Sequence, residues 1–278
     1  MCSVTRPGGR LQRFRSLPSH PIGAALARWQ LTLSRGIWHH RLRTMTERLY
    51  QRDSYLKAFD ATVVSSTPEG VVLDRTAFFP SGGGVLGDEG TLTRGGERFH
   101  VMETVDAPDG ILHRLDRPGP RVGDAVHGEL DWPRRYLLMR YHTATHVLTG
   151  VMFNDWGVRV TGNQLTPEKG RVDFAFEQFD REVLEEGFRR SNALIARDLA
   201  VRIDFVPGAE ARARPELFKL ETTFPHDLDQ FRLVEIDGFD TQADGGCHVA
   251  RLGEIGRLAL TKSENKGKAN RRVYFVLE

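Results

Sequence analysis

The octapeptide Tyr141-His142-Thr143-Ala144-Thr145-His146-Val147-Leu148 carries the clearest structural signal in this 278-residue chain. Around it, within residues 134–156, apolar side chains recur every three or four positions, at Leu137, Tyr141, Ala144, Leu148 and Val151. This spacing predicts a helix with His142 and His146 on the same face. Two imidazoles on one helix face indicate metal binding, although a lone pair of this kind is more often structural.

A second stretch, Asp244-Gly245-Gly246-Cys247-His248-Val249, lies about a hundred residues downstream. Asp244 and His248 are again four residues apart, but the two glycines between them favour a tight loop that can aim both side chains at one point. Zinc accepts imidazole nitrogen, thiolate sulfur and carboxylate oxygen, and a catalytic zinc site keeps a position open for substrate. We therefore predict a zinc site built from His142, His146, Asp244 and His248.

Cys247 is the alternative to Asp244 as the fourth ligand. A thiolate is a softer and stronger zinc ligand than a carboxylate. Cys247 is adjacent to His248, however, and neighbouring side chains in an extended segment point to opposite sides. Geometry therefore favours Asp244 and ligand chemistry favours Cys247; we predict Asp244.

The composition, with 40% hydrophobic and 27% charged residues, is ordinary for a globular protein. No apolar run approaches the roughly 18 residues that a membrane-spanning helix needs, so we do not expect the chain to be an integral membrane protein. Cys2 and Cys247 are too few for a disulfide framework, and we expect a reducing compartment, the cytoplasm. The length allows two domains, each with its own core.

The net charge of +2 conceals an uneven distribution. Residues 1–46 contain eight arginines and no Asp or Glu, so the remaining 232 residues carry 31 basic and 37 acidic side chains, a net charge of −6. A nucleic acid would therefore have to be bound by a local basic patch. One such patch has five basic residues in eleven positions and is suited to a sugar-phosphate backbone: Lys262, Lys266, Lys268, Arg271 and Arg272.

Residues 45–131 read as short strands separated by turns, which predicts a small N-terminal β-barrel. The expected strands are Asp60–Ser65, Gly70–Thr76, Arg98–Thr104, Gly110–Leu115 and Ala125–Leu130. Within this region Gly82-Gly83-Gly84 exposes backbone N–H groups that could approach a ligand closely, although a flexible hairpin is an equal alternative.

Residues 132–278 are expected to form an α+β domain that begins at Trp132-Pro133, because proline suits the first turn of a helix. We predict an amphipathic helix from Asp180 to Leu199, with Asp180 as its N-cap. Strands are expected at 171–176 and 200–206, and further strands that continue the same sheet at 231–236, 256–260 and 272–277.

Two smaller features of this domain are open to more than one interpretation. Residues 160–164 read as a loop whose hydroxyl and amide groups suit hydrogen bonding to a ligand, although most such loops are turns. Asp173 alternates with apolar residues in a strand, so it either faces solvent, which we favour, or orients an imidazole of the metal site.

Taken together, these motifs resemble the editing domain of alanyl-tRNA synthetases and of the freestanding AlaX proteins. The resemblance runs from about Met45 to the end, and its motifs occur in the family's order: residues 79–84, 142–148, 171–174, 245–256 and 262–272. Three positions depart from the family. Asp244 and Cys247 stand where the family usually has Cys and Thr in Cys-Gly-Gly-Thr-His, and Val85 stands where Gln is common.

The resemblance implies a zinc-dependent hydrolase that deacylates mischarged tRNA(Ala), with serine or glycine as the wrong amino acid. His142, His146 and His248 would be its catalytic residues, and zinc would polarise the ester or anchor the substrate's amino group. The resemblance also implies substrate binding by the Gly-rich motif, Gly82, Gly83 and Gly84, and by Thr161 and Gln164. It further implies that the basic patch contacts the acceptor end of tRNA(Ala). We expect a monomer.

Two alternatives to this enzyme remain open: a tRNA-binding protein of the same fold with weakened catalysis, and an unrelated zinc hydrolase of small-molecule esters. A zinc protease of the HExxH type is not expected, because Thr143 stands where that motif places its catalytic glutamate. A complete synthetase is not expected either, because no class II core precedes the barrel.

Residues 1–44 match nothing in the family and are expected to be disordered. We favour translation from Met45, because residues 45–50 resemble the usual start of the two-domain AlaX proteins. The alternatives are a transit peptide, which would make the protein organellar, and a basic arm for RNA.

Overall fold

The 25-residue helix α1 (Trp132–Trp156) runs through the middle of the chain and carries two of the predicted ligands. It begins where the Asp131 side chain accepts a hydrogen bond from the backbone N–H of Arg134, with Pro133 in the first turn, and it ends at Gly157, whose φ of 68° suits a left-handed C-cap. Nearly all residues from 138 to 152 are buried. The predicted helix is therefore confirmed, but it is enclosed by protein on all sides.

This computed structural model describes residues 46–176, 180–218, 228–267 and 269–278. The interpretations of residues 1–44, and the organellar location that depends on one of them, lie outside that range. The division into domains at residue 131 stays a prediction, because the described residues all belong to one compact unit. Among the described residues, no helix has the length and apolar character needed to cross a membrane.

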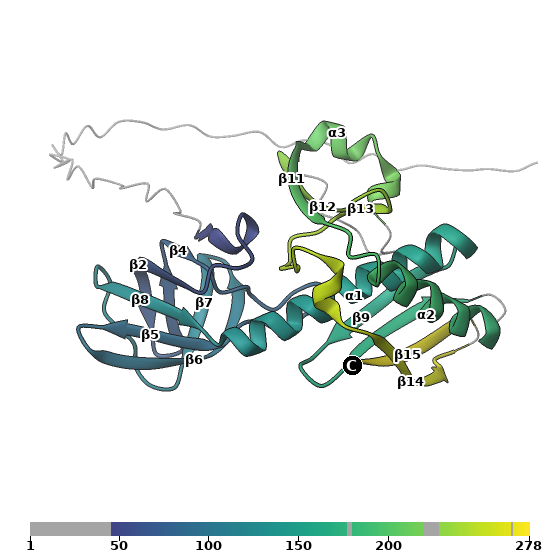
Figure 1. Ribbon diagram of the computed structural model, residues 1–278. Helices are drawn as coiled ribbons and strands as arrows, with labels where there is room; N and C mark the ends of the chain where they lie inside the picture. Colours follow the sequence, from purple (N-terminus) through teal and green to yellow (C-terminus); the bar gives the residue numbers. More distant parts are fainter. Residues whose placement is uncertain (1–45, 177–179, 219–227, 268) are drawn as a thin grey trace, which may run out of the picture. The chain divides into compact units, whose positions relative to one another are not determined.

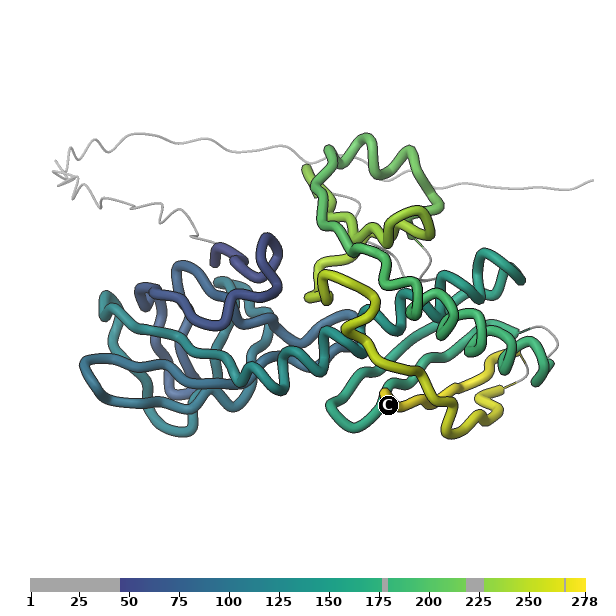
Figure 2. Tube along the Cα trace, viewed as in Figure 1, coloured from purple at the N-terminus to yellow at the C-terminus, as the bar shows by residue number. Residues whose placement is uncertain are grey.

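Six strands before α1 close into a barrel; they lie in the purple-to-teal part of the chain trace in Figure 2. They are β2 (Ala58–Thr67), β3 (Gly70–Leu73), β5 (Gly90–Arg94), β6 (Glu97–Ala107), β7 (Gly110–Leu115) and β8 (Ala125–Leu130), hydrogen-bonded in the order β2-β3-β7-β6-β5-β8 and then back to β2. Every neighbouring pair is antiparallel. Inward-facing apolar side chains such as Phe59, Val71 and Leu92 fill the interior.

The prediction of a barrel is confirmed, with two differences in its strands. The segment Gly70–Thr76 is interrupted at Asp74, and β4 (Arg75–Thr76) pairs in parallel with β1 (Glu47–Arg48), just ahead of the 3-10 turn Leu49–Gln51. Strand β5 was not predicted, because Leu92 is its one fully buried apolar residue and gives no recognisable alternation.

The part of the chain from residue 157 onward contributes two separate sheets, shown in Figure 1. The first has the order β14-β15-β10-β9, from β9 (Arg159–Leu165), β10 (Gly170–Ala175), β14 (Leu258–Asn265) and β15 (Asn270–Leu277). The second has the order β11-β12-β13, from β11 (Val201–Pro207), β12 (Gln230–Ile236) and β13 (Asp240–Ala243). Helix α1 and helix α2 (Arg181–Ile195) pack against the four-stranded sheet.

Three predictions about this region are wrong in part. The strands at 200–206 and 231–236 do not continue the sheet of β10 but pair with each other, since alternation defines the faces of a strand and not its partner. Residues 160–164 belong to strand β9 and do not form a loop. Helix α2 keeps Asp180 as its N-cap but ends at Ile195, shortly before Asp198 adopts a left-handed φ of 51°.

Short elements complete the described fold. Helix α3 (Gly208–Arg212) and the 3-10 turn Pro215–Leu217 follow β11, and the 3-10 turn Leu252–Ile255 precedes β14. The result is a mixed α+β protein with a six-stranded barrel.

A buried ion pair joins α1 to the segments around the barrel. Arg135 is 1% exposed and Asp88 is 2% exposed. The Arg135 Nε atom lies 2.9 Å from both oxygens of Asp88, and its Nη1 and Nη2 atoms donate to the carbonyls of Ser54 and Ala77 at 3.0 and 2.5 Å. Asp88 also accepts a hydrogen bond from the backbone N–H of Phe79. One guanidinium thus holds three separate segments of chain beside the first turn of α1.

We expect Asp88→Asn to lower the free energy of unfolding by about 3–5 kcal/mol, because it leaves the Arg135 charge buried without a counter-charge. Chemical denaturation measures the change. The control is Glu89→Gln, which removes a more exposed pair with Arg134 and should cost less than about 1 kcal/mol. Equal effects of the two substitutions would contradict this assignment.

His113 is a fully buried titratable residue of the barrel. Its Nε2 atom lies 2.8 Å from Thr76 Oγ1, and its Nδ1 atom lies 3.2 Å from the carbonyl oxygen of Val71. Burial lowers the pKa of His113 from 6.5 to about 4, because a charged ring would lose its hydration. The unfolded chain therefore binds a proton between these two pH values, whereas the folded chain does not.

The stability that a neutral His113 contributes is complete above pH 6.5 and is lost as the pH falls towards 4, a total of about 3 kcal/mol. Urea unfolding between pH 7 and pH 4.5 should show that His113→Gln has a shallower pH dependence than the natural protein. If the free energy of unfolding changed equally with pH in the two proteins, His113 would not be the cause of this pH dependence.

Candidate metal centre

Helix α1 presents His142 and His146 from consecutive turns, as their spacing predicts. Their rings lie edge to face with centroids 5.0 Å apart. Both side chains are nearly buried, with 5% and 7% of the residue surface exposed. The helix therefore holds two imidazoles in fixed positions at low exposure to water.

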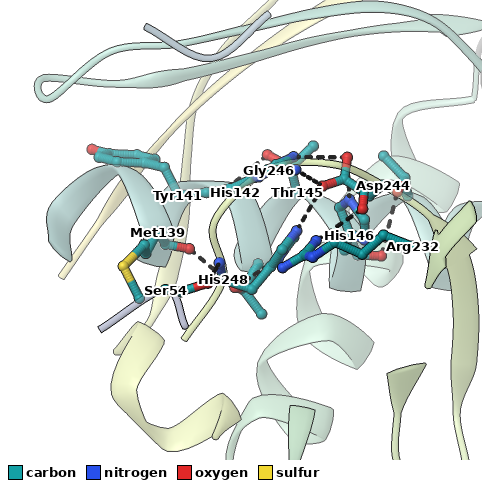
Figure 3. A network of polar contacts seen from close by, with 12 residues as sticks. Ser54, Met139, Tyr141, His142, Thr145, His146, Arg232, Asp244, Gly246 and His248 are labelled. Carbon is teal, nitrogen blue, oxygen red and sulfur yellow. Dashed lines mark hydrogen bonds and ion pairs between the residues drawn. The ribbon is translucent and has the colours of Figure 1, made fainter. Parts of the chain in front are cut away.

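The loop after β13 brings Asp244 and His248 to the same place, as Figure 3 shows. The backbone N–H of Asp244 donates to the carbonyl of Arg232 on β12, so the loop starts from a fixed strand. The backbone N–H of Gly246 donates to Asp244 Oδ1 at 2.6 Å and turns the chain back. No helix forms between Asp244 and Val249, which confirms the predicted loop.

The four side chains form one cluster whose potential ligand atoms all lie within 4.8 Å of one another. His142 Nε2 and His146 Nε2 lie 3.5 and 3.7 Å from Asp244 Oδ2, and His248 Nε2 lies 3.1 Å from Asp244 Oδ1. Ligand atoms about 2 Å from a tetrahedral zinc ion are about 3.3 Å apart, so these separations suit a metal ion at the centre. The cluster could therefore bind a metal ion with little rearrangement.

The electrostatics of the cluster favour the protonation states that bind metal. Burial by itself would raise the pKa of Asp244, but the charge of His142 and hydrogen bonds from the three histidines lower it well below its usual range. Burial, together with the nearby charges of His142 and His146, lowers the pKa of His248 well below its usual value. Burial also lowers the pKa of His146. An ionised carboxylate and neutral imidazoles are the forms that coordinate a cation.

Cys247, the alternative fourth ligand, is not part of this cluster. It is a buried free cysteine, and burial raises the pKa of its thiol to about 11, which disfavours the thiolate that a metal would need. The charge of Arg135 acts on it in the opposite direction. Of the two alternatives, Asp244 is the one that the fold brings to the histidines.

Arg232 is a residue of the site that the sequence analysis missed. Its side chain lies on β12 and is 6% exposed; Nε donates to the carbonyl of Gln51 and Nη1 to the carbonyl of Asp244, both at 2.8 Å. These bonds fix the backbone of Asp244. The available signal was a charged residue between Phe231 and Leu233 in a mostly apolar strand.

The Gly-rich motif packs against β9. Gly82 and Val85 pair across a tight turn, and the carbonyl of Gly84 accepts a hydrogen bond from the backbone N–H of Leu165 at 2.7 Å. Gly84 has a φ of 81°, and a Cβ there would lie 2.4 Å from the Asn163 side chain, so this position requires glycine. The motif forms a tight turn that is hydrogen-bonded to β9.

The predicted substrate residues on β9 are placed differently from each other. Thr161 donates from its hydroxyl to the carbonyl of Asp173 and accepts from Asn270, so its hydroxyl bonds within the sheet. Gln164 is exposed. In the described part of the chain these contacts link the sheet and do not reach the histidines, so the predicted roles of Thr161, Gln164 and Gly82–Gly84 stay predictions.

Both interpretations of Asp173 are wrong. Its carboxylate is 4% exposed and accepts hydrogen bonds from Arg272 at 2.7 and 2.8 Å and from Lys266 at 3.1 Å. The hydrogen bonds from Arg272 lower its pKa, which burial would raise. The strand pattern placed Asp173 on a face but did not show that β15 supplies cations opposite it.

The predicted basic loop is a hairpin between β14 and β15. Lys266 and Arg272 pair with Asp173, and Lys262 pairs with Glu264 at 2.5 Å. Arg271 lies on β15, and Lys268 is outside the described residues. At least two of the five predicted tRNA contacts thus also neutralise a buried carboxylate, and a role for any of them in tRNA binding stays a prediction.

Gly246 offers a test of the cluster geometry. A Cβ at this position would lie 2.5 Å from His142 Cε1 and 2.8 Å from His142 Nδ1. We expect Gly246→Ala to displace the His142 ring and to weaken the binding of added zinc by about tenfold or more, since about 1.4 kcal/mol corresponds to a factor of ten. Competition with a chelator measures the affinity.

The control for this prediction is Gly245→Ala in the same loop, where the nearest atom to a new Cβ is Gln51 Nε2 at 3.7 Å. This substitution should leave zinc binding unchanged. The same affinity for both variants would mean that His142 does not need its observed position.

Family models match two parts of the chain. Residues 231–274 match the threonyl and alanyl tRNA synthetase second additional domain, which includes Asp244 and His248. Residues 43–134 match the tRNA synthetases class II (A) model.

The chain is also similar over most of its length to curated proteins. It is 41% identical over 237 residues to the alanyl-tRNA editing protein AlaX-M of Saccharolobus solfataricus, covering 84% of this chain and 100% of that protein. It is 43% identical over 244 residues to AlaX-M of Methanosarcina mazei, covering 84% and 97%. It is 38% identical to the alanine–tRNA ligase of Ignicoccus hospitalis, covering 83% of this chain but 26% of the ligase.

Proposed function

The chain belongs to the family of AlaX-M alanyl-tRNA editing proteins, and we propose that it removes the wrong amino acid from mischarged tRNA(Ala) in trans. Similarity at 41–43% identity over nearly the full length of these relatives supports this reaction. The substrates proposed are Ser-tRNA(Ala) and Gly-tRNA(Ala), and the bond broken is the ester between the amino acid and the terminal ribose.

The observation that carries the proposal is the buried cluster of His142, His146, Asp244 and His248. We propose that these four residues hold a zinc ion, since three imidazoles and a carboxylate are a donor set that zinc accepts. When bound, zinc polarises an ester carbonyl and makes water a stronger acid. The protein supplies the fixed geometry, the negative charge of Asp244 and the exclusion of bulk water.

The four side chains of the cluster are unequally exposed to solvent, which favours substrate approach from one side. The side chain of Asp244 is 23% exposed, whereas those of His142, His146 and His248 are 6%, 9% and 1% exposed. An ester therefore approaches from the Asp244 side, while the imidazoles remain shielded. Low exposure also strengthens any interaction between the site and developing charge on the ester.

The proposed contacts with tRNA and with the amino acid follow the sequence predictions. We propose that the acceptor end of tRNA contacts the β14–β15 hairpin, where the side chains of Lys262 and Lys266 are 63% and 50% exposed. We propose that the Gly-rich turn and β9 lie along the amino-acid end, and that the protein acts as a monomer.

A deacylation assay separates this function from the two alternatives. The purified protein should release serine or glycine from tRNA(Ala) but should leave Ala-tRNA(Ala) largely intact, and a chelator should abolish the reaction. Binding of tRNA without release would indicate the weakened binding protein. Hydrolysis of small esters without any action on tRNA would indicate the unrelated hydrolase.

The fourth ligand has its own test. We expect Asp244→Ala to lose bound zinc and to reduce the deacylation rate by at least about 100-fold. Loss of a residue that only supports a ligand already lowers affinity or activity by up to about 100-fold, and this substitution removes a direct ligand. Cys247→Thr should keep zinc and most activity, since the Cys247 thiol is outside the cluster. Elemental analysis and single-turnover kinetics give the two readouts. Zinc lost in Cys247→Thr and kept in Asp244→Ala would reverse the assignment.

A further inference from the structure

The hydroxyl of Thr143 lies where three hydrogen bonds meet. Thr143 follows His142 on α1 and is fully buried. Its Oγ1 atom lies 3.0 Å from the carbonyl oxygen of Met139, 3.2 Å from the backbone nitrogen of Val249 and 3.1 Å from His248 Nδ1. The contact therefore joins helix α1 to the loop that carries Asp244 and His248.

The proton positions in this group follow from what each partner can do. The backbone N–H of Val249 can only donate, and the carbonyl of Met139 can only accept. The hydroxyl has a single proton, and donation to the carbonyl four residues earlier is a common arrangement for a threonine inside a helix. With that proton on Met139, the remaining lone pair of Thr143 accepts a hydrogen bond from His248 Nδ1–H.

The other nitrogen of His248 faces the cluster, with Nε2 3.1 Å from Asp244 Oδ1. In a neutral imidazole one nitrogen carries the proton and the other has a free lone pair. A proton on Nδ1 therefore leaves Nε2 free to bind a cation, whereas a proton on Nε2 would block it. Figure 3 shows His248 between Met139 and Asp244.

We propose that Thr143 is a positioning residue that holds His248 in its Nδ1–H tautomer and aims Nε2 at the metal. The relay runs from His248 Nδ1–H to the Thr143 hydroxyl and from that hydroxyl to the carbonyl of Met139. His142 has no such partner, since its Nδ1 atom is buried without a hydrogen bond among the described residues. His248 is thus a ligand whose metal-binding tautomer the fold supports with a hydrogen bond. The inference rests on the proposed metal site.

Zinc affinity of Thr143 variants tests the proposal. Thr143→Val keeps the shape but removes the acceptor, and it should raise the zinc Kd about 10- to 100-fold, as loss of an outer-shell partner typically does. Thr143→Ser keeps the hydroxyl, and its zinc Kd should stay within about threefold of that of the natural protein, a much smaller change than for Thr143→Val. An unchanged Kd for Thr143→Val in a protein that binds zinc would overturn the proposal.

Thr145→Val is the matched control. Thr145 lies on the same helix, is 4% exposed and donates to the carbonyl of Tyr141 at 2.9 Å, the same type of bond that Thr143 makes to Met139. This hydrogen bond does not involve a histidine. A general cost of losing a buried helical hydroxyl would lower zinc affinity in both variants, whereas loss of the tautomer control would lower it in Thr143→Val alone.

A second measurement needs no variant. Imidazole nitrogen chemical shifts of His248 in the zinc-loaded natural protein report which nitrogen carries the proton and which binds the metal, and we expect Nδ1–H with Nε2 on zinc. Zinc bound through Nδ1 would overturn the proposal. Failure of the natural protein to bind zinc would instead count against the proposed metal centre itself, on which the inference rests.

Discussion

The buried charge of Arg135 is the constraint on which the other parts of this structure depend. A guanidinium with 1% exposure must have its N–H groups bonded and its charge balanced, because neither can be left to water. Asp88 balances the charge, and the carbonyls of Ser54 and Ala77 accept the remaining bonds. Residues that are far apart in sequence are therefore fixed at the start of the helix that carries His142 two turns later.

The same segments reach the metal centre. The hydroxyl of Ser54, whose carbonyl Arg135 binds, accepts a long hydrogen bond from the backbone N–H of His248 at 3.4 Å. Arg232 performs a similar task on the other side, where it links Gln51 to the carbonyl of Asp244. Arg232 thus binds the start of the loop directly, and Arg135 reaches its end through Ser54. These contacts keep three imidazoles and a carboxylate close together.

The sequence predicted the donors of the site better than its surroundings. Periodicity was enough to place His142 and His146 on one face of α1, and the two glycines before Cys247 were enough to favour a loop there. Prediction from the sequence failed where the role of a side chain depends on a partner from another strand. Asp173 was expected to face solvent, yet β15 places Arg272 against it, and the segment at Thr161 was expected to be a loop, yet it pairs with β10.

By itself the sequence determined which side chains could bind a metal, the helix that holds two of them, most barrel strands and the likeness to editing proteins, since these depend on local spacing. Only the tertiary structure decided that the later strands form two sheets, that Asp244 and not Cys247 reaches the histidines, and that Thr143 touches His248. The physical reason is that a repeat of two or 3.6 residues defines the faces of an element, whereas its neighbours follow from the burial and hydrogen bonding of the whole chain.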